Sequence, residues 1–143
     1  GLKLCGVKIP YSKLIGHSDA DVGLHAICDA IFGALSMRDI GFHFPNNENK
    51  WKNASSSRFI IFCRQKLKEK KFFVLNLDVN IIAERPRISN YVMQMKKKIS
   101  KLLQIDPKII SIKSTTNEKI GFIGNGEGIA AEAIIQISDE KIN

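Results

Sequence analysis

The amino-acid sequence predicts a single α/β (α+β) domain in which helices cover a mixed β-sheet. Three observations support this fold class. Strand-like and helix-like segments alternate along the chain, no repeat or linker divides it, and its 143 residues match the size of one compact domain. We therefore treat residues 1–143 as one domain.

The N-terminal quarter of the chain predicts a strand followed by a long helix. Residues 2–9 alternate loosely between apolar and polar side chains and end at Pro10, as a strand does. Residues 18–37 predict the clearest helix, because Ser18 and Asp21 resemble a capping box and apolar side chains recur behind them at helical spacing.

The rest of the chain shows the same two periodicities. The strand over residues 74–83 is well defined, because its apolar side chains alternate with Asn76, Asp78 and Asn80. The other expected elements are a turn-rich stretch over 39–53, helices over 55–70 and 90–103, and strands over 109–113 and 129–137. The strands carry more apolar surface than three helices can cover, which predicts self-association.

Composition excludes several classes of protein. The formal net charge of +8 would suit an anionic partner, but the Lys residues are dispersed and the aromatic–basic interleaving that stacks bases is absent. No segment approaches the apolar run of a membrane span. We therefore expect neither a nucleic-acid nor a membrane partner. Cys5, Cys28 and Cys63 lack metal-ligand spacing, which predicts three reduced thiols, at least two of them buried.

A stripe of His and Asp residues marks the start of the first predicted helix. His17 and Asp19 lie at its entry, and Asp21, His25 and Asp29 follow at i, i+4 and i+8. An imidazole flanked by carboxylates is typical of zinc sites, whereas the alternative is a set of capping acids beside a surface histidine. A catalytic zinc needs about three protein ligands. No other side chain pairs convincingly with His25, so both interpretations stay open.

Two polar segments in the C-terminal third could hold a phosphorylated ligand. Residues 113–119 follow a predicted strand and carry hydroxyls together with Glu118, a candidate ligand for a hard cation such as Mg²⁺. Residues 121–128 have the glycine density of a loop with positive-φ positions, but they lead into a strand and are not a Rossmann fingerprint. By spacing alone, a tight connection is the simpler interpretation of both.

Taken together, these segments resemble the 2-C-methyl-D-erythritol 2,4-cyclodiphosphate synthase family. The resemblance runs in order over nearly the whole chain, from about residue 6 to residue 137. The segments that carry it are HSDADV (17–22), LHA (24–26), DIG (39–41), FP (44–45), DVNIIAERPR (78–87), TTNEKIGF (115–122) and GEGIA (126–130).

The resemblance implies an enzyme of the non-mevalonate isoprenoid pathway. Members of that family are phosphorus–oxygen lyases that convert 4-diphosphocytidyl-2-C-methyl-D-erythritol 2-phosphate into the 2,4-cyclodiphosphate and release CMP, by metal-assisted intramolecular attack of the 2-phosphate on the diphosphate. It also implies Zn²⁺ and Mg²⁺ or Mn²⁺ as cofactors, and a homotrimer with active sites between subunits. A bacterial cytoplasm or a plastid-type organelle is implied as the location, and the abundance of Lys, Ile and Asn favours the organelle.

The same resemblance assigns roles to individual residues. His17 and Thr116 would be catalytic, His25 a zinc ligand and Glu118 the ligand of the magnesium-type ion. The substrate would be bound by Ser18, Asp39, Ile40, Gly41, Phe44, Pro45, Asn46, Asn47, Glu48, Phe122 and Asn125. Of these, residues 39–41, residues 44–48 and Phe122 would surround its methylerythritol part. The cytidine nucleotide would be bound by Ala83, Glu84, Arg85, Pro86, Arg87, Ile88, Ser89, Thr115, Thr116, Asn117 and Glu118.

The sequence departs from the family pattern at several places. The family has an Asp-x-His pair of zinc ligands upstream of its first strand, and this pair is absent here. We therefore expect that the remaining zinc ligands lie upstream of Gly1. We also expect that the N-terminal part of the family domain is missing from this sequence. Asn46 replaces an acid, Arg87 a frequent Lys, and Asn125 a basic residue that faces the central cavity in many members. The missing pair leaves open a non-catalytic module that binds a cytidine nucleotide. A basic nucleic-acid adaptor, a third alternative, would show steep salt dependence.

Overall fold

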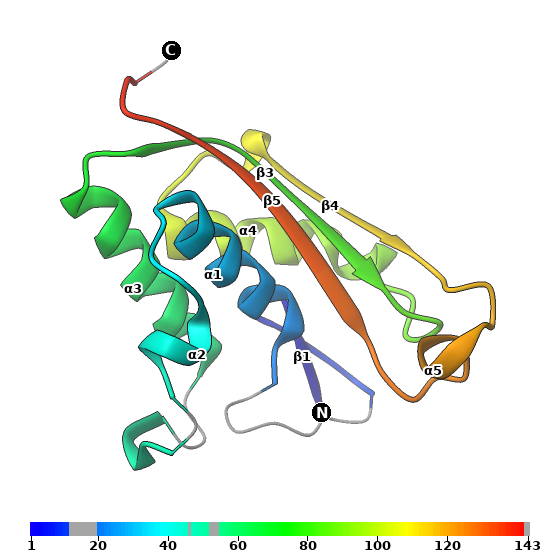
Figure 1. The fold of residues 1–143 in the computed structure, drawn as a ribbon. Helices are drawn as coiled ribbons and strands as arrows, with labels where there is room; N and C mark the ends of the chain where they lie inside the picture. Colours follow the sequence, from blue (N-terminus) through cyan, green and yellow to red (C-terminus); the bar gives the residue numbers. More distant parts are fainter. Residues whose placement is uncertain (12–19, 46, 52–54, 142–143) are drawn as a thin grey trace.

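A three-stranded mixed sheet forms one side of the molecule (Figure 1). The computed structural model describes residues 1–11, 20–45, 47–51 and 55–141. The strand order is β4-β3-β5, in which β3 (Phe73–Ile82) runs parallel to β4 (Ile110–Thr115) and antiparallel to β5 (Ala130–Ser138). The predicted mixed sheet is confirmed.

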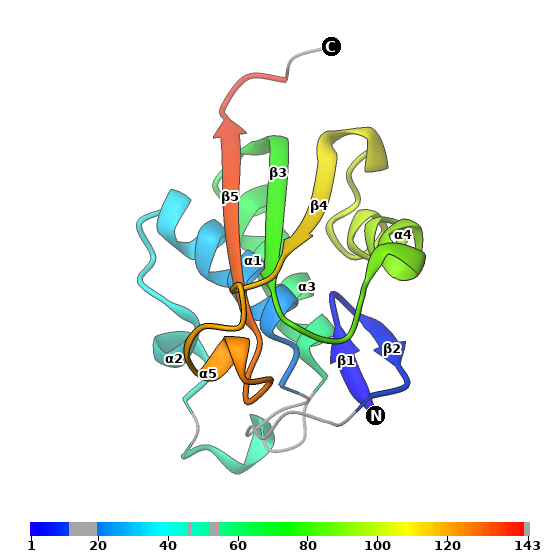
Figure 2. The ribbon, with the colours of Figure 1, turned by 90° about the vertical axis from the view of Figure 1, so that its right-hand side faces the viewer.

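Three long helices lie on one face of this sheet. They are α1 (Val22–Ala34), α3 (Ser56–Glu69) and α4 (Val92–Leu103). Figures 1 and 2 show them on the same side, and in the described part of the chain no long helix covers the opposite face. The α/β (α+β) architecture is therefore confirmed. Over the same residues, every helix is too short or too polar to cross a bilayer.

The N-terminal segment is a hairpin, so the prediction of one strand over residues 2–9 is wrong. β1 (Leu2–Leu4) pairs antiparallel with β2 (Val7–Ile9), and the two strands are joined by Cys5 and Gly6. Both linking residues have positive φ, 50° and 79°, as a two-residue hairpin turn requires. The sequence signal for this turn was an interruption of the apolar–polar alternation, because the apolar side chains of Leu4 and Val7 are three residues apart.

Helix α1 begins and ends within the predicted range of 18–37. Its N-cap is Asp21, whose Oδ1 accepts a hydrogen bond from the Leu24 N–H at 2.9 Å. The same carboxylate accepts the N–H groups of Cys5 and Gly6 in the hairpin turn, at 2.8 and 2.7 Å. Asp21 is 0% exposed. This buried acid therefore joins the hairpin to α1, while Ser18 lies outside the described residues.

Short helices occupy the connections. The glycine-rich segment 121–128 contains α5 (Gly121–Gly124), which was not predicted, although Gly121 and Gly126 have the expected positive φ. The other short helices are α2 (Ile40–His43) and 3₁₀ turns at Asn49–Trp51, Ser89–Tyr91 and Pro107–Ile109.

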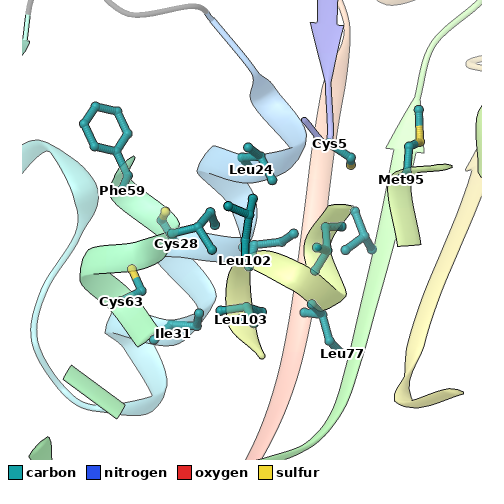
Figure 3. Close-up of a cluster of buried hydrophobic side chains, with 14 of the residues drawn as sticks. Cys5, Leu24, Cys28, Ile31, Phe59, Cys63, Leu77, Met95, Leu102 and Leu103 are labelled. Atoms are coloured by element: carbon teal, nitrogen blue, oxygen red, sulfur yellow. The ribbon is translucent and has the colours of Figure 1, made fainter. Parts of the chain in front are cut away.

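The core lies between the sheet and the three helices (Figure 3). Side chains such as Leu77 of β3 and Met95 of α4 are fully buried there. Cys5, Cys28 and Cys63 are free and buried, which confirms the prediction of reduced thiols. Burial raises the pKa of the Cys5 and Cys28 thiols, so both stay protonated at neutral pH.

Candidate active site

Two loops meet at the carboxyl edge of the parallel pair β3–β4. Ile82 at the end of β3 is in register with Thr115 at the end of β4, and the Ala83 N–H donates to the Thr115 carbonyl at 3.0 Å. Because parallel strands end at the same edge of a sheet, the turn 83–89 and the loop 116–120 emerge side by side. Figure 2 shows this end of the molecule, with α5 next to it.

A pocket of about 300 Å³ lies between the turn and the loop. It is lined by Ile81, Ala83, Glu84, Pro86, Arg87, Ile88, Ser89, Ser114, Thr115 and Thr116. Most of the residues predicted to bind the nucleotide are thus brought together. Ile81 and Ser114 were missed because each lies inside a strand, one position before its last residue, where the polar loop signal has not yet begun. Arg85, Asn117 and Glu118 adjoin the pocket without lining it.

The pocket offers the groups that a phosphate needs. The exposed Arg87 contributes a guanidinium, and Thr115, Thr116 and Ser89 contribute hydroxyls. Ile88 is buried and fixes the turn to the core. The volume of the pocket lies at the lower end of the range of about 300–1,000 Å³ for small-molecule pockets, which suits part of a nucleotide.

Hydrogen bonds hold the loop after β4 in shape. The Asn117 N–H donates to Glu84 Oε2 at 2.6 Å, and the Glu118 N–H donates to Thr116 Oγ1 at 3.3 Å. Glu118 and Lys119 both have positive φ, 52° and 60°. The loop therefore presents the Thr116 hydroxyl and the exposed Glu118 carboxylate from a defined backbone.

His25 lies in the contact between α1 and α3. Its Nε2 is 2.9 Å from Ser56 Oγ. The two acids of the predicted stripe serve the backbone instead, because Asp21 caps α1 and Asp29 Oδ1 accepts the Ile40 N–H at 2.8 Å. Over the described ranges, no three His, Cys, Asp or Glu side chains are grouped to hold a metal. These residues by themselves do not fit a zinc site.

The segment predicted to bind methylerythritol forms α2 and the turn after it. Asp39 Oδ1 accepts the Phe42 N–H at 3.0 Å and caps α2. Phe44 is 5% exposed and its ring stacks on Phe59 with centroids 4.3 Å apart, so the ring belongs to the core. The half-buried or exposed members of the segment are Asp39, Ile40, Gly41, Pro45, Asn47 and Glu48.

Two further residues predicted to bind the substrate lie in and after α5. Phe122 is 63% exposed, and Asn125 is exposed at the end of the helix. Gly128 packs under the Phe122 ring, where an added Cβ would stand 3.1 Å from a ring carbon. A glycine at 128 therefore keeps this aromatic side chain in place beside the loop.

Nearly the whole chain matches one known protein family. The model of the YgbB family matches residues 1–138. The chain belongs to the YgbB family. The first relative, a 2-C-methyl-D-erythritol 2,4-cyclodiphosphate synthase of Ehrlichia ruminantium (strain Welgevonden), is 49% identical over 97% of this chain and 81% of its own length. The bifunctional enzyme IspD/IspF of Wolbachia pipientis wMel is 52% identical over 94% of this chain and 34% of its own length.

Solved structures of YgbB-family proteins share the fold. The CDP complex of IspF from Plasmodium falciparum superposes with a TM-score of 0.85 and is 40% identical, over 95% of this chain and 81% of that chain. The bifunctional IspDF of Campylobacter jejuni gives a TM-score of 0.91 at 37% identity, over 95% of this chain and 37% of that chain.

The residues predicted to form the site of this YgbB-family chain lie in two places. The pocket at the β3–β4 edge holds most of the predicted nucleotide residues, but none of the described residues before β3 lines it. His25 and the segment 39–48 therefore lie apart from that pocket. The predicted residues His17, Ser18 and Asn46 lie outside the described residues.

Proposed function

We propose that this chain converts 4-diphosphocytidyl-2-C-methyl-D-erythritol 2-phosphate into 2-C-methyl-D-erythritol 2,4-cyclodiphosphate and releases CMP. The observation that carries this function is the pocket at the β3–β4 edge, where Arg87 and several hydroxyls line a space that suits part of a nucleotide. Membership of the YgbB family and the likeness to a CDP complex support the cytidine diphosphate as ligand.

The reaction is an intramolecular phosphoryl transfer. An oxygen of the 2-phosphate forms a bond to the diphosphate phosphorus that carries the methylerythritol, the bond from this phosphorus to the bridging oxygen breaks, and CMP leaves with that oxygen. Positioning and charge neutralisation contribute most of the rate in such reactions. In this proposal Arg87 holds the CDP end, and the Thr116 hydroxyl supports the charge that develops on the transferred group.

Two metal ions belong to the proposal. Glu118 presents an exposed carboxylate beside the pocket, the type of oxygen ligand that Mg²⁺ or Mn²⁺ prefers, and such an ion supplies positive charge to the diphosphate when bound. For Zn²⁺ the only predicted ligand among the described residues is His25, so the other ligands of such a site would lie outside these residues.

A homotrimer with active sites between subunits completes the proposal. None of the described residues before β3 lines the pocket, which supports a second copy that brings the α1 and 39–48 side of the site to it. The sheet face that no long helix covers offers a surface for that contact (Figure 1).

The proposed location rests on the relatives rather than on the fold. The similar curated sequences come from bacteria such as Ehrlichia and Wolbachia, which favours a bacterial cytoplasm. The preference for a plastid-type organelle, which rested on Lys, Ile and Asn content, receives no support from them.

Substitution of Glu118 tests the catalytic proposal. In the full-length protein, we expect Glu118→Gln to lower kcat for CMP release by at least about a hundredfold, the scale of one lost electrostatic stabiliser. CMP release is measured at saturating substrate and Mg²⁺. The matched control is Glu140→Gln, which neutralises an exposed carboxylate beyond β5 at the opposite end of the sheet and leaves kcat unchanged.

The alternative is a module that binds a cytidine nucleotide without catalysis. It is favoured by the single zinc ligand within the described residues. Wild-type protein that binds CDP but releases no CMP would establish the module and overturn the enzyme. Wild-type turnover by Glu118→Gln would remove Glu118 from the metal site.

A further inference from the structure

A carboxylate lines the pocket that is proposed to receive phosphates. Glu84 is flanked by Ala83 and the turn that carries Arg87, and it is half-buried there. A negative charge facing a diphosphate would oppose binding, because like charges repel. The hydrogen bond of this side chain explains its presence. Glu84 Oε2 accepts the N–H of Asn117, which lies in the loop after β4, at 2.6 Å.

The hydrogen bond between Glu84 and Asn117 joins the turn 83–89 to the loop 116–120. These two segments lie beyond the last backbone hydrogen bond of the sheet. The β3–β4 ladder ends with the Ala83 N–H donating to Thr115. Asn117 lies two residues further on, where the chain has already left the strand. The Glu84 carboxylate therefore extends the connection between the turn and the loop past the end of the sheet.

The loop beyond Asn117 is closed upon itself. The Ile120 N–H donates to the Asn117 carbonyl at 2.9 Å, and Asn117 Nδ2 donates to the Ile120 carbonyl at 2.7 Å. The two residues inside this closed turn, Glu118 and Lys119, both have positive φ. Non-glycine residues adopt that conformation only when their surroundings hold them in it.

Gly124 of α5 holds the loop from its other side. A Cβ at this position would stand 2.7 Å from the Lys119 Cα and 2.9 Å from its carbonyl oxygen, so the helix packs directly on the loop backbone. The backbone that carries Glu118 is thus fixed at Asn117 by Glu84 and at Lys119 by the close approach of Gly124.

We propose that Glu84 is a positioning residue, whose carboxylate holds the Asn117 amide and thereby the loop that presents Thr116 and Glu118 to the diphosphate. This inference rests on the proposed function. It assigns to Glu84 neither a bond to the nucleotide nor one to a metal. The charge on Glu84 strengthens its hydrogen bond to a backbone amide, and the amide in turn reduces the repulsion between this carboxylate and the phosphates.

Two substitutions separate positioning from direct contact. Glu84→Ala removes the acceptor, whereas Glu84→Gln keeps an oxygen that can accept the Asn117 N–H and removes the charge. Hydrogen exchange of the Asn117 amide, followed by NMR, reports the bond itself. We expect exchange to accelerate by about tenfold or more in Glu84→Ala and to return towards the wild-type rate in Glu84→Gln.

Turnover and affinity are measured on the same variants of the full-length protein. A displaced catalytic group lowers kcat by roughly ten- to a hundredfold, so we expect that loss in Glu84→Ala and substantial rescue in Glu84→Gln. The dissociation constant for CDP should change by less than about threefold in both variants, because neither substitution removes a contact that holds CDP before and during the reaction. An unchanged thermal midpoint shows that Glu84→Ala is folded, and Glu140→Ala is the matched control.

Three outcomes overturn the inference. If Glu84→Ala leaves the exchange of the Asn117 amide unchanged, the bond does not hold the loop. If Glu84→Gln loses as much kcat as Glu84→Ala and weakens activation by Mg²⁺, Glu84 is a metal ligand. If Glu84→Ala binds CDP at least about tenfold more tightly, its carboxylate faces the phosphates. Wild-type protein that neither binds CDP nor releases CMP would instead refute the proposed function, while the exchange rates still judge the role of Glu84.

Discussion

The two arginines of the turn after β3 differ in what surrounds them. Arg87 lines the pocket, whereas Arg85, two residues earlier, does not. Neither forms an ion pair with a carboxylate among the residues that the structure describes. A guanidinium without an ion-pair partner can bind a phosphate without first breaking an internal ion pair. Of the two arginines, only Arg87 lines a pocket that could hold that phosphate.

Replacement of Arg87 should weaken nucleotide binding more than catalysis. We expect Arg87→Ala to reduce the CDP binding free energy by about 1.5–3 kcal/mol, the range of a hydrogen bond to a charged group. The contact exists before and during reaction, so kcat at saturating substrate should fall much less. Isothermal titration calorimetry with CDP measures the effect.

Arg85→Ala is the matched comparison, because it removes the same group outside the pocket lining. Its loss of CDP affinity should be smaller than that of Arg87→Ala. Equal losses would show that the pocket is not the nucleotide site, and a larger loss in Arg85→Ala would exchange the two roles.

At the level of elements, one carboxylate connects the N-terminal hairpin to α1. Asp21 accepts hydrogen bonds from Cys5, Gly6 and Leu24, all within 2.9 Å, and water does not reach it. A buried carboxylate that accepts several backbone N–H groups is strongly stabilised in its charged form. Loss of this side chain would leave the hairpin amides without their acceptor.

We expect Asp21→Ala to lower the free energy of unfolding by at least about 3 kcal/mol, because each hydrogen bond to a charged group contributes about 1.5–3 kcal/mol. Urea denaturation followed by circular dichroism measures it. Asp106→Ala is the control, since Asp106 caps a 3₁₀ turn through one exposed bond to the Lys108 N–H and should cost only about 1 kcal/mol. Similar losses in both variants would contradict the connecting role of Asp21.

At the scale of the whole molecule, the uncovered sheet face carries an unusual combination of side chains. Ile134 of β5 is 74% exposed and lies in register with Asp78 of β3. Asp78 Oδ2 is 2.9 Å from Lys113 Nζ, while its Oδ1 is buried without a hydrogen-bond partner among the described residues. An exposed apolar side chain beside an unpaired acceptor suits contact with another copy of the chain.

If this face forms the trimer, a charge at its centre should dissociate it. We expect Ile134→Asp to shift the protein from trimer to monomer at micromolar concentration, because burying an unpaired carboxylate opposes association. Sedimentation equilibrium measures the mass. Met93→Asp places the same charge at an equally exposed site, 75% exposed, on α4 and should remain trimeric. A monomeric wild type, or a trimeric Ile134→Asp, would refute this assembly surface.

Local sequence determined most of the elements and the nucleotide segments. The periodicity of residues 55–70, 74–83 and 90–103 predicted α3, β3 and α4 closely, because helix and strand repeats are recorded in neighbouring side chains. The segments 83–89 and 115–118 were recognised from their motifs, and the pocket brings most of their residues together. The turn at Cys5 and Gly6 was missed because a single strand also fits that short pattern.

Tertiary structure alone decided how the polar side chains are used. The sequence left Asp21 open as part of a metal stripe or as a capping acid. It caps α1, and its partners in the hairpin are 15 and 16 residues away. Glu84 was assigned to the nucleotide, yet its partner Asn117 is 33 residues away. Local sequence cannot contain these pairings, because a carboxylate accepts whichever N–H the folded backbone brings within about 3 Å. Composition and periodicity thus determined which segments form, and the packing of distant segments decided which acids serve the fold and which remain for a ligand.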